Sequence, residues 1–372
     1  MEEVDFGKQR FGFGMMRLPM KGEEVDIETV KKMVDLFLQE GFVYFDTAHG
    51  YLDGKSEKAI KTCLTSRYPR DKYLLTNKLT EPYFHKEEDI RPFFQSQLDA
   101  CGVDYFDFYL MHAQNARNYL HFQKCHAYET AFSLKKEGKI RHVGISFHDK
   151  PEVLDQILTD HPEIEAVQIQ FNYVDYDNPA VQSGDCLKVC EKHHKPIIVM
   201  EPVKGGTLAR LPEDCGAVLD ALQGGSHASY ALRFVASFKP IKMILSGMSD
   251  VAQMKDNLSF MKDVKPLNEE EMQAINKVKE LFHAKNMIPC TACHYCTAGC
   301  PKRILIPDLF SCYNAKMTFK DWNSDFYYHE VATKEGHGKA SDCIKCGQCE
   351  RVCPQHLQIR KLLEDVSNQF DK

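Results

Sequence analysis

The stretch Phe42-Val43-Tyr44-Phe45-Asp46-Thr47-Ala48-His49-Gly50-Tyr51 changes from apolar to polar at Asp46. Its first four residues form an apolar, aromatic run that is typical of a buried strand. The strand ends in a carboxylate, and Tyr51 follows that carboxylate five residues later. By itself, the stretch is explained equally well if Asp46 caps a helix and Tyr51 is a rim aromatic. The assignment therefore depends on the residues at the other strand ends.

Strand-like and helix-like stretches alternate along the chain. The expected strands cover residues 11–16, 43–47, 73–79, 106–112, 140–146, 166–172, 196–201 and 242–246. The expected helices cover residues 27–40, 56–66, 89–101, 128–136, 151–158, 181–193, 228–238 and 251–261, with a further outer helix at 269–283. Eight strand–helix units in this length predict an α/β fold, a parallel (β/α)8 TIM barrel. A doubly wound sheet is less favoured because no Gly-x-Gly-x-x-Gly follows the first strand.

Titratable residues stand at three consecutive strand ends of this predicted barrel. Asp46 and Tyr51 follow the second strand, Lys78 ends the third, and His112 ends the fourth. In such barrels the C-terminal strand ends form the active site. Each residue alone has an ordinary structural role as an alternative, but together they indicate one catalytic site.

These four residues, in this order and strand context, resemble the catalytic tetrad of the aldo-keto reductase superfamily over about residues 5–285. The resemblance implies hydride transfer between a nicotinamide and a carbonyl, with Tyr51 as the general acid. A free tyrosine has a pKa of about 10, and a nearby Lys78 ammonium would lower it. Asp46 would hold Lys78 charged, and His112 would orient the carbonyl oxygen.

The resemblance also implies contacts to NADP or NAD. Ser146 and Gln168 match the residues that bind the carboxamide, although Phe147 replaces a common asparagine. Met200 stands where many members stack a tyrosine on the nicotinamide. A thioether can pack against a ring face, but more loosely.

After the last strand, the residues Gly247, Ser249, Gln253, Asp256 and Asn257 match the loop and helix that bind the phosphates and adenine. Gly247 and Gln253 occupy positions where several members carry Lys and Arg for a 2′-phosphate. The choice between NADP and NAD therefore stays open. An ordinary loop before a helix is the alternative.

Two cysteine runs follow residue 285. They read Cys290-x2-Cys293-x2-Cys296-x3-Cys300-Pro301 and Cys343-x2-Cys346-x2-Cys349-x3-Cys353-Pro354, at an offset of 53 residues. This is the bacterial ferredoxin pattern, in which the fourth cysteine of each run binds the other cluster. One [4Fe–4S] cluster is therefore assigned to Cys290, Cys293, Cys296 and Cys353, and the second to Cys343, Cys346, Cys349 and Cys300. Two zinc sites are the alternative, but three thiols followed by Cys-Pro fit zinc poorly.

The domains are expected at residues 1–285, the barrel, and 286–372, a 4Fe–4S ferredoxin-type domain. The segment 304–340 between the runs is helical and aromatic in pattern and similar to helical two-cluster modules. We expect it to pack against the barrel, or, as a weaker alternative, to cover the substrate mouth with Trp322. The tail at 359–366 reads as an amphipathic helix, and the pocket candidates are Met16, Tyr83, Phe84 and Gln114.

Composition limits the partners. The net charge of −6 and the lack of a long Lys/Arg block argue against nucleic acid and anionic membranes. The acidic start, residues 1–5, lacks the apolar segment of a secretory signal, and no run of 18 apolar residues appears. Fifteen cysteines then indicate metal binding in a reducing cytoplasm.

The expected function is NAD(P)H-dependent reduction of a small aldehyde or ketone, with the clusters structural or serving an electron-transfer protein. A nicotinamide gives two electrons as hydride, whereas a [4Fe–4S] cluster passes one, so direct exchange needs an intermediary such as a flavin. The alternatives are a flavin- or ferredoxin-linked oxidoreductase in the same pocket, and a redox-sensing, dinucleotide-binding regulator.

Overall fold

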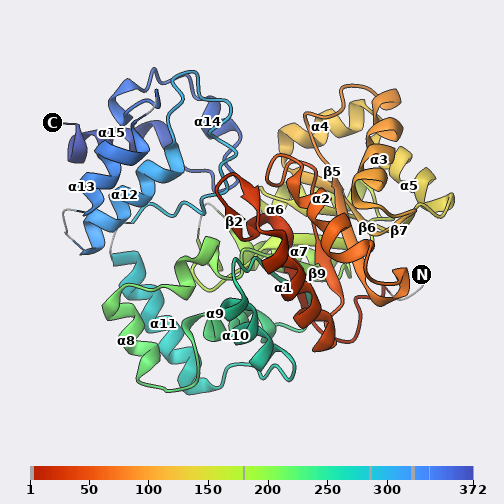
Figure 1. The fold of residues 1–372 in the computed structure, drawn as a ribbon, viewed down its shortest axis with the longest axis horizontal. Coiled ribbons are helices and arrows are strands. Elements are labelled where there is room, and N and C mark those ends of the chain that lie inside the picture. Colours follow the sequence, from red (N-terminus) through yellow and green to blue (C-terminus); the bar gives the residue numbers. More distant parts are fainter. Residues whose placement is uncertain (1–3, 179–180, 285–286, 320–322, 335, 372) are drawn as a thin grey trace. The chain divides into compact units, whose positions relative to one another are not determined.

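The computed structural model describes residues 4–178, 181–284, 287–319, 323–334 and 336–371. The chain separates into two compact units. The first comprises Met1–Pro202 and Ala231–Leu267, and the second Val203–Tyr230 and Asn268–Lys372. Figure 1 shows the elements of both units, coloured along the sequence.

The first unit is built on a closed parallel barrel, which confirms the predicted (β/α)8 fold. Neighbouring strands follow the sequence order around the barrel, and β1 closes it by pairing with both β4 and β10. The strands are β1 (Phe11–Gly14), β4 (Tyr44–Asp46), β5 (Leu74–Leu79), β6 (Phe106–Gln114), β7 (Ile140–Phe147), β8 (Ala166–Gln170), β9 (Ile197–Met200) and β10 (Ile241–Ser246). Each matches a predicted strand, with no end shifted by more than two residues.

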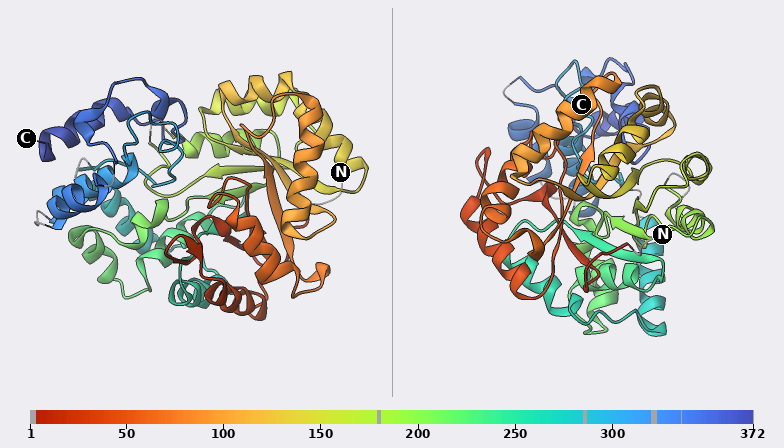
Figure 2. Two further views of the ribbon diagram at one scale, coloured as in Figure 1. Left: turned by 45° about the horizontal axis from the view of Figure 1, so that its top comes forward. Right: turned by 90° about the vertical axis from the view of Figure 1, so that its right-hand side faces the viewer.

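Helices lie outside these strands (Figure 2). They are α1 (Ile27–Gln39), α2 (Lys55–Ile60), α3 (Glu87–Cys101), α5 (Ala127–Lys136), α6 (Pro151–Asp160), α7 (Ser183–Lys192), α9 (His227–Ala236) and α10 (Val251–Met261). In α1, Val30, Met33, Val34 and Phe37 recur at helical spacing and are buried, and Asp26 caps the first turn. The helix predicted at 56–66 is correct as far as Ile60 but continues as a π-helix at Lys61–Thr65.

A short hairpin and one α-helix of this unit are among the elements that were not predicted. A short hairpin pairs β2 (Met20–Lys21) with β3 (Glu24–Val25), and its strands are too short to show a period. Helix α4 (Ala116–Lys124) begins after Asn115, whose side chain accepts hydrogen bonds from the backbone of Arg117 and Asn118. An asparagine cap is a usable helix-start signal, so α4 was open to prediction.

The second unit is helical. It contains α8 (Glu213–Asp220), α11 (Glu269–Ala284), α12 (Ile306–Phe319), α13 (Asn323–Phe326), a π-helix at Tyr327–Ala332, α14 (Gln348–Arg351) and α15 (Ile359–Phe370). Helix α8, also not predicted, packs against α11. The helical character expected for 304–340 and for the tail is confirmed, and Phe310, Tyr328, Leu363, Val366 and Phe370 belong to one core cluster. Trp322 lies outside the described residues. Within the described ranges, no helix has the length and apolar character needed to cross a lipid bilayer.

Candidate active site

Parallel pairing brings the three predicted strand ends to one end of the barrel. Strand β4 ends at Asp46, which is in register with Thr76 of β5, and Lys78 of β5 is in register with Leu110 of β6. His112 lies two residues further along β6. All three titratable side chains are buried, and Lys78 has no exposed surface. These three ionisable side chains are therefore shielded from water, so their charged forms must be stabilised by neighbouring groups of the protein.

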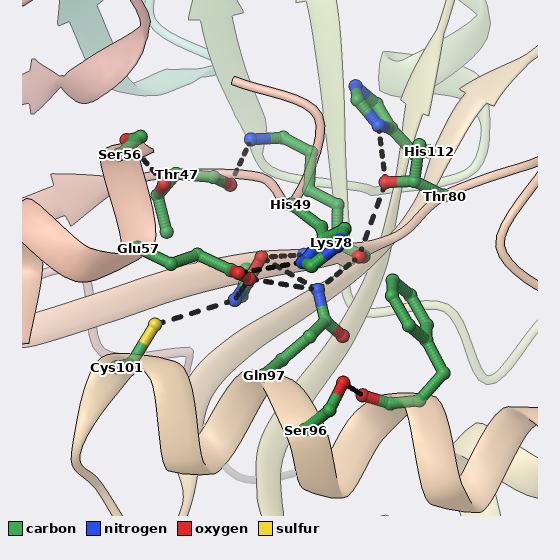
Figure 3. Close-up of polar contacts among 12 residues, drawn as sticks. Thr47, His49, Ser56, Glu57, Lys78, Thr80, Ser96, Gln97, Cys101 and His112 are labelled. Carbon is green, nitrogen blue, oxygen red and sulfur yellow. Dashed lines mark hydrogen bonds and ion pairs between the residues drawn. The ribbon is translucent and has the colours of Figure 1, made fainter. Parts of the chain in front are cut away.

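Lys78 forms a buried ion pair with Asp46. Its Nζ donates to Asp46 Oδ1 at 2.7 Å and to the Thr47 carbonyl at 2.8 Å, the second contact being visible in Figure 3. Gln168 donates to the other Asp46 oxygen at 3.4 Å. Burial raises the pKa of Asp46 and lowers the pKa of Lys78, and the charge of each partner opposes the shift of the other.

Tyr51 lies beside this ion pair and beside His112. Lys78 Nζ is 4.9 Å from the centroid of the Tyr51 ring. The Tyr51 and His112 rings meet edge-on, with centroids 6.1 Å apart. The structure thus brings together all four residues of the predicted tetrad. A cation at this distance favours the ionised form of the phenol over the neutral one.

His112 is held neutral. Burial, with the charges of Lys78 and His148, keeps the pKa of His112 well below its usual value. Its Nδ1 lies 2.8 Å from the hydroxyl of Thr80, as Figure 3 shows. Thr80 was not among the predicted residues, although it follows Lys78 by two positions along the same chain segment and so points to the same side.

The residues predicted to bind the carboxamide lie at neighbouring strand ends. Ser146 of β7 and Gln168 of β8 are in register with each other. The Ser146 hydroxyl accepts a hydrogen bond from the Ala113 backbone at 2.8 Å, and Gln168 reaches Asp46. Met200 is half-buried at the end of β9.

The loop after β10 is organised by its own polar groups. Asp250 caps α10 by accepting from the Gln253 backbone, and the Gln253 side chain donates to the other Asp250 oxygen at 2.9 Å. Ser249 donates its backbone N–H to Gln253 at 2.9 Å. Asn257 is buried and lies 3.3 Å from the Ser246 hydroxyl. Gly247 is half-buried, as is Asp256, which lies on the same helix as Asn257.

The cysteines of the second unit gather in the two predicted sets. Burial raises the pKa of Cys296, and the thiols of Cys293, Cys290 and Cys353 are close enough to raise it further. The remaining four line one cavity and are Cys300, Cys343, Cys346 and Cys349. The fourth cysteine of each run therefore lies beside the first three cysteines of the other run, which is the arrangement of the ferredoxin pattern.

Backbone donors already point at several of these sulfurs. Ala292 N–H donates to Cys290 Sγ, and Ile304 N–H to Cys300 Sγ, both at 3.4 Å. Backbone N–H groups beyond Cys353 likewise counter the rise in its pKa that burial causes. Such N–H···S bonds suit thiolates bound to iron, so the residues present fit [4Fe–4S] clusters. No disulfide joins the cysteines in the described ranges, and no three metal-ligating side chains there converge tightly enough for a single ion.

Two family models match the chain. The aldo/keto reductase family matches residues 10–280, and a 4Fe–4S dicluster domain matches residues 271–358. The chain belongs to the aldo/keto reductase family. It is an NAD(P)-dependent oxidoreductase that also carries a 4Fe–4S domain.

Relatives of this reductase are distant. An uncharacterized oxidoreductase from Schizosaccharomyces pombe is 25% identical over 279 residues, which cover 68% of this chain and 82% of the relative. An NADH-specific methylglyoxal reductase from Escherichia coli is 24% identical over 207 residues, which cover 51% of this chain and 59% of that relative. An aldo-keto reductase from Klebsiella pneumoniae in complex with NADPH has the same fold, with a TM-score of 0.59 at 18% identity, covering 73% of this chain and 90% of that one.

Behind the tetrad, the reductase barrel contains a buried polar network that sequence reasoning missed. Glu57 of α2 is 1% exposed and lies 2.7 Å from His49 Nδ1. Its other oxygen accepts from Asn77 at 2.8 Å and from Gln97 at 3.3 Å. Figure 3 shows the Glu57 side chain reaching from α2 toward Gln97 of α3. The only signal in the sequence was an acidic residue on an otherwise core-facing helical turn.

The pocket candidates divide into two pairs. Tyr83 is 44% exposed, stacks on Phe93 and meets His49 edge-on, while Met16 is half-buried. Phe84 and Gln114 are fully buried, so their assignment to the mouth was wrong. Phe84 packs against Phe122 in the interior. The Gln114 side chain accepts a hydrogen bond from the Tyr128 hydroxyl.

Proposed function

We propose that this protein reduces a small aldehyde or ketone with NADPH or NADH, and that Tyr51 is the general acid. The observation that carries this proposal is the buried Lys78–Asp46 ion pair against the Tyr51 ring, with His112 at the ring's edge. When bound, the nicotinamide supplies hydride to the carbonyl carbon. The developing alkoxide then needs a proton, which the Tyr51 hydroxyl donates.

Each of the other three residues has a distinct task. Lys78 favours loss of the Tyr51 proton by stabilising the phenolate. Asp46 and the Thr47 carbonyl fix the position of the ammonium through the two hydrogen bonds of Lys78. His112, being neutral, orients the carbonyl oxygen through a hydrogen bond without adding a charge.

For the cofactor, we propose that Ser146 and Gln168 bind the carboxamide and Met200 packs on the nicotinamide ring. Gly247, Ser249, Gln253, Asp256 and Asn257 would bind the phosphates and the adenine end. The names of the relatives include both an NADH-specific reductase and an NADPH complex, so either dinucleotide is consistent with the family.

Replacing Tyr51 by Phe tests the catalytic proposal. We expect the rate of carbonyl reduction to fall by about 10²- to 10⁴-fold, because that is the usual contribution of a general acid. The dissociation constants for NADH and NADPH should not change. The measurement is steady-state reduction of methylglyoxal and a panel of small ketones, with nucleotide binding followed by fluorescence.

The matched control is Tyr83→Phe, which removes an exposed phenol from the loop after β5. It should keep wild-type turnover, because the Tyr83 ring contacts Phe93 and His49, whereas the Lys78 ammonium faces the Tyr51 ring. Full activity in Tyr51→Phe, or equal losses in both variants, would refute the assignment.

We further propose that residues 286–372 form a separate module with two [4Fe–4S] clusters, the barrel occupying residues 1–285. Cys290, Cys293, Cys296 and Cys353 would hold one cluster, and Cys300, Cys343, Cys346 and Cys349 the other. The second set is nearer to solvent within its unit, because Cys346 is exposed and Ile344 is 57% exposed. An electron-transfer protein would exchange single electrons with the clusters at that set.

A further inference from the structure

The loop after β10, which we propose binds the phosphates, has no cation at the two positions where several family members carry Lys and Arg for a 2′-phosphate. Position 247 is a glycine, and Gln253 is neutral. The Gln253 side chain is also engaged within the loop, by the Ser249 backbone and by Asp250. The diphosphate of a dinucleotide carries two negative charges, so a positive group from elsewhere in the fold would stabilise it strongly.

Arg17 lies against this loop although it is far away in the sequence. It ends the short 3-10 helix Met15–Arg17 that follows β1, and β1 pairs with β10 in the barrel. A Cβ atom at Gly247 would lie only 3.3–3.4 Å from the aliphatic stem of Arg17, so the glycine allows that stem to rest on the loop. The Ser249 hydroxyl donates to the Arg17 carbonyl at 2.9 Å.

The guanidinium of Arg17 is paired with a carboxylate that is itself held in place. Arg17 Nη2 lies 3.3 Å from Glu201 Oε1, and the two side chains are 26% and 18% exposed. Glu201 directly follows Met200 and has a φ of +55°, a left-handed conformation that is unfavourable for glutamate. Buried Asn172 fixes this turn by donating to the Glu201 carbonyl at 3.0 Å, and to Asp175 at 2.7 Å.

The 3.3 Å contact is long for a charge-assisted hydrogen bond, which is normally 2.7–2.9 Å. Both side chains also retain access to solvent, and partly exposed ion pairs of this kind contribute little. The contact between Arg17 and Glu201 is therefore a weak one, and the guanidinium can exchange this carboxylate for another anion.

We propose that Arg17 is the cation that binds the diphosphate of the dinucleotide, and that Glu201 holds Arg17 in place until the diphosphate replaces it. The inference rests on the proposed dinucleotide site. On one side, Arg17 contacts Glu201, which is next to Met200 at the proposed nicotinamide position. On the other side, Arg17 lies against Gly247, in the loop proposed to lead to the adenine end. The diphosphate joins those two ends of the ligand, so it must pass between them.

The test compares the intact wild-type protein with the Arg17→Met variant. The dissociation constants of NADH and of NADPH are measured for both by fluorescence, without substrate. Methionine keeps an unbranched apolar stem and removes the charge. We expect the dissociation constants of both nucleotides to rise by about tenfold to a hundredfold, as for loss of one charged hydrogen bond. The dependence of binding on salt should weaken in the same variant.

Two further variants separate this role from a structural one. Glu201→Gln should bind both nucleotides as tightly as wild type or more tightly, because it removes the competing carboxylate. Arg67→Met breaks a comparable partly exposed ion pair with Asp35 of α1 and should leave both constants unchanged.

Unchanged binding in Arg17→Met would overturn the inference. A loss confined to NADPH would also overturn it, because Arg17 would then contact the 2′-phosphate and not the diphosphate. Weaker binding in Glu201→Gln would contradict the exchange. If the wild-type protein binds neither nucleotide, the proposed function fails and the inference fails with it.

Discussion

One hydroxyl determines which nitrogen of His112 carries the proton. The ring is neutral because burial keeps its pKa low, so only one nitrogen is protonated. Thr80 Oγ1 is 2.8 Å from His112 Nδ1 but 3.4 Å from the Lys78 carbonyl, so the contact to His112 is the stronger one. We infer that the hydroxyl donates to Nδ1, which leaves the proton on Nε2. That nitrogen can then donate to a carbonyl oxygen.

Replacing Thr80 by Val should therefore slow carbonyl reduction without weakening dinucleotide binding. Valine keeps the shape but removes the hydrogen bond, which is worth about 1 kcal/mol, or roughly a fivefold to tenfold loss in kcat. Thr80→Ser keeps the hydroxyl and should retain most of the activity. The measurement is kcat for the three proteins with one aldehyde, and equal losses in the Val and Ser variants would contradict the tautomer argument.

At the scale of elements, Glu57 connects parts of the barrel that are distant in sequence. It lies on α2, accepts from Asn77 of β5 and Gln97 of α3, and Gln97 in turn accepts from Tyr109 of β6. Gln97 also donates to the Lys78 carbonyl at 3.0 Å. The network therefore fixes the strand that carries Lys78 against two outer helices.

Glu57→Gln should lower the free energy of unfolding by about 1–3 kcal/mol, the usual cost of leaving a buried polar group unsatisfied. The amide nitrogen of the new glutamine is a donor, and it would face one of the groups that surround Glu57, which are His49, Asn77 and Gln97. Where that group is also a donor, no hydrogen bond can form. Glu191→Gln, on the exposed face of α7, is the matched control and should have no effect. The readout is the midpoint of urea unfolding at constant slope. Coincident midpoints for Glu57→Gln and wild type would show that the network does not stabilise the barrel.

The same scale shows what the sequence could and could not predict. Apolar strands ending in Asp46, Lys78 and His112 were predictable, because parallel strands in a barrel end on one face. Thr80 was open to prediction from its alternation with Lys78. Arg17 and Glu201 were not, because their meeting depends on how β1 and β9 sit beside β10, and no local pattern encodes that contact. Phe84 and Gln114 failed for a related reason, since no local pattern shows that β6 extends to Gln114 or that Phe84 packs against Phe122.

At the scale of the whole molecule, the cysteine module has its own small core. Among the described residues, that core cluster draws only on residues 288–370, and two of its buried members, Cys296 and Cys349, are proposed cluster ligands. A core of this size is marginal by itself, and metal binding commonly supplies the missing stability in such modules. The buried residues of α8 and α11, such as Leu219 and Val278, do not belong to that cluster.

Removing the iron should therefore unfold residues 286–372 and leave the reductase barrel intact. Chelation under anoxia should release about eight iron atoms per chain, as two [4Fe–4S] clusters require. Hydrogen exchange followed by mass spectrometry should then show lost protection in α12 and α15. Strands β1 and β4–β10 should stay protected, as should α8 and α11, because their apolar contacts lie outside the module core. An untreated sample kept under anoxia for the same time is the control. Retained protection in α12 and α15 would show that the clusters are not structural, and lost protection in α8 and α11 would place the boundary elsewhere than at residue 285.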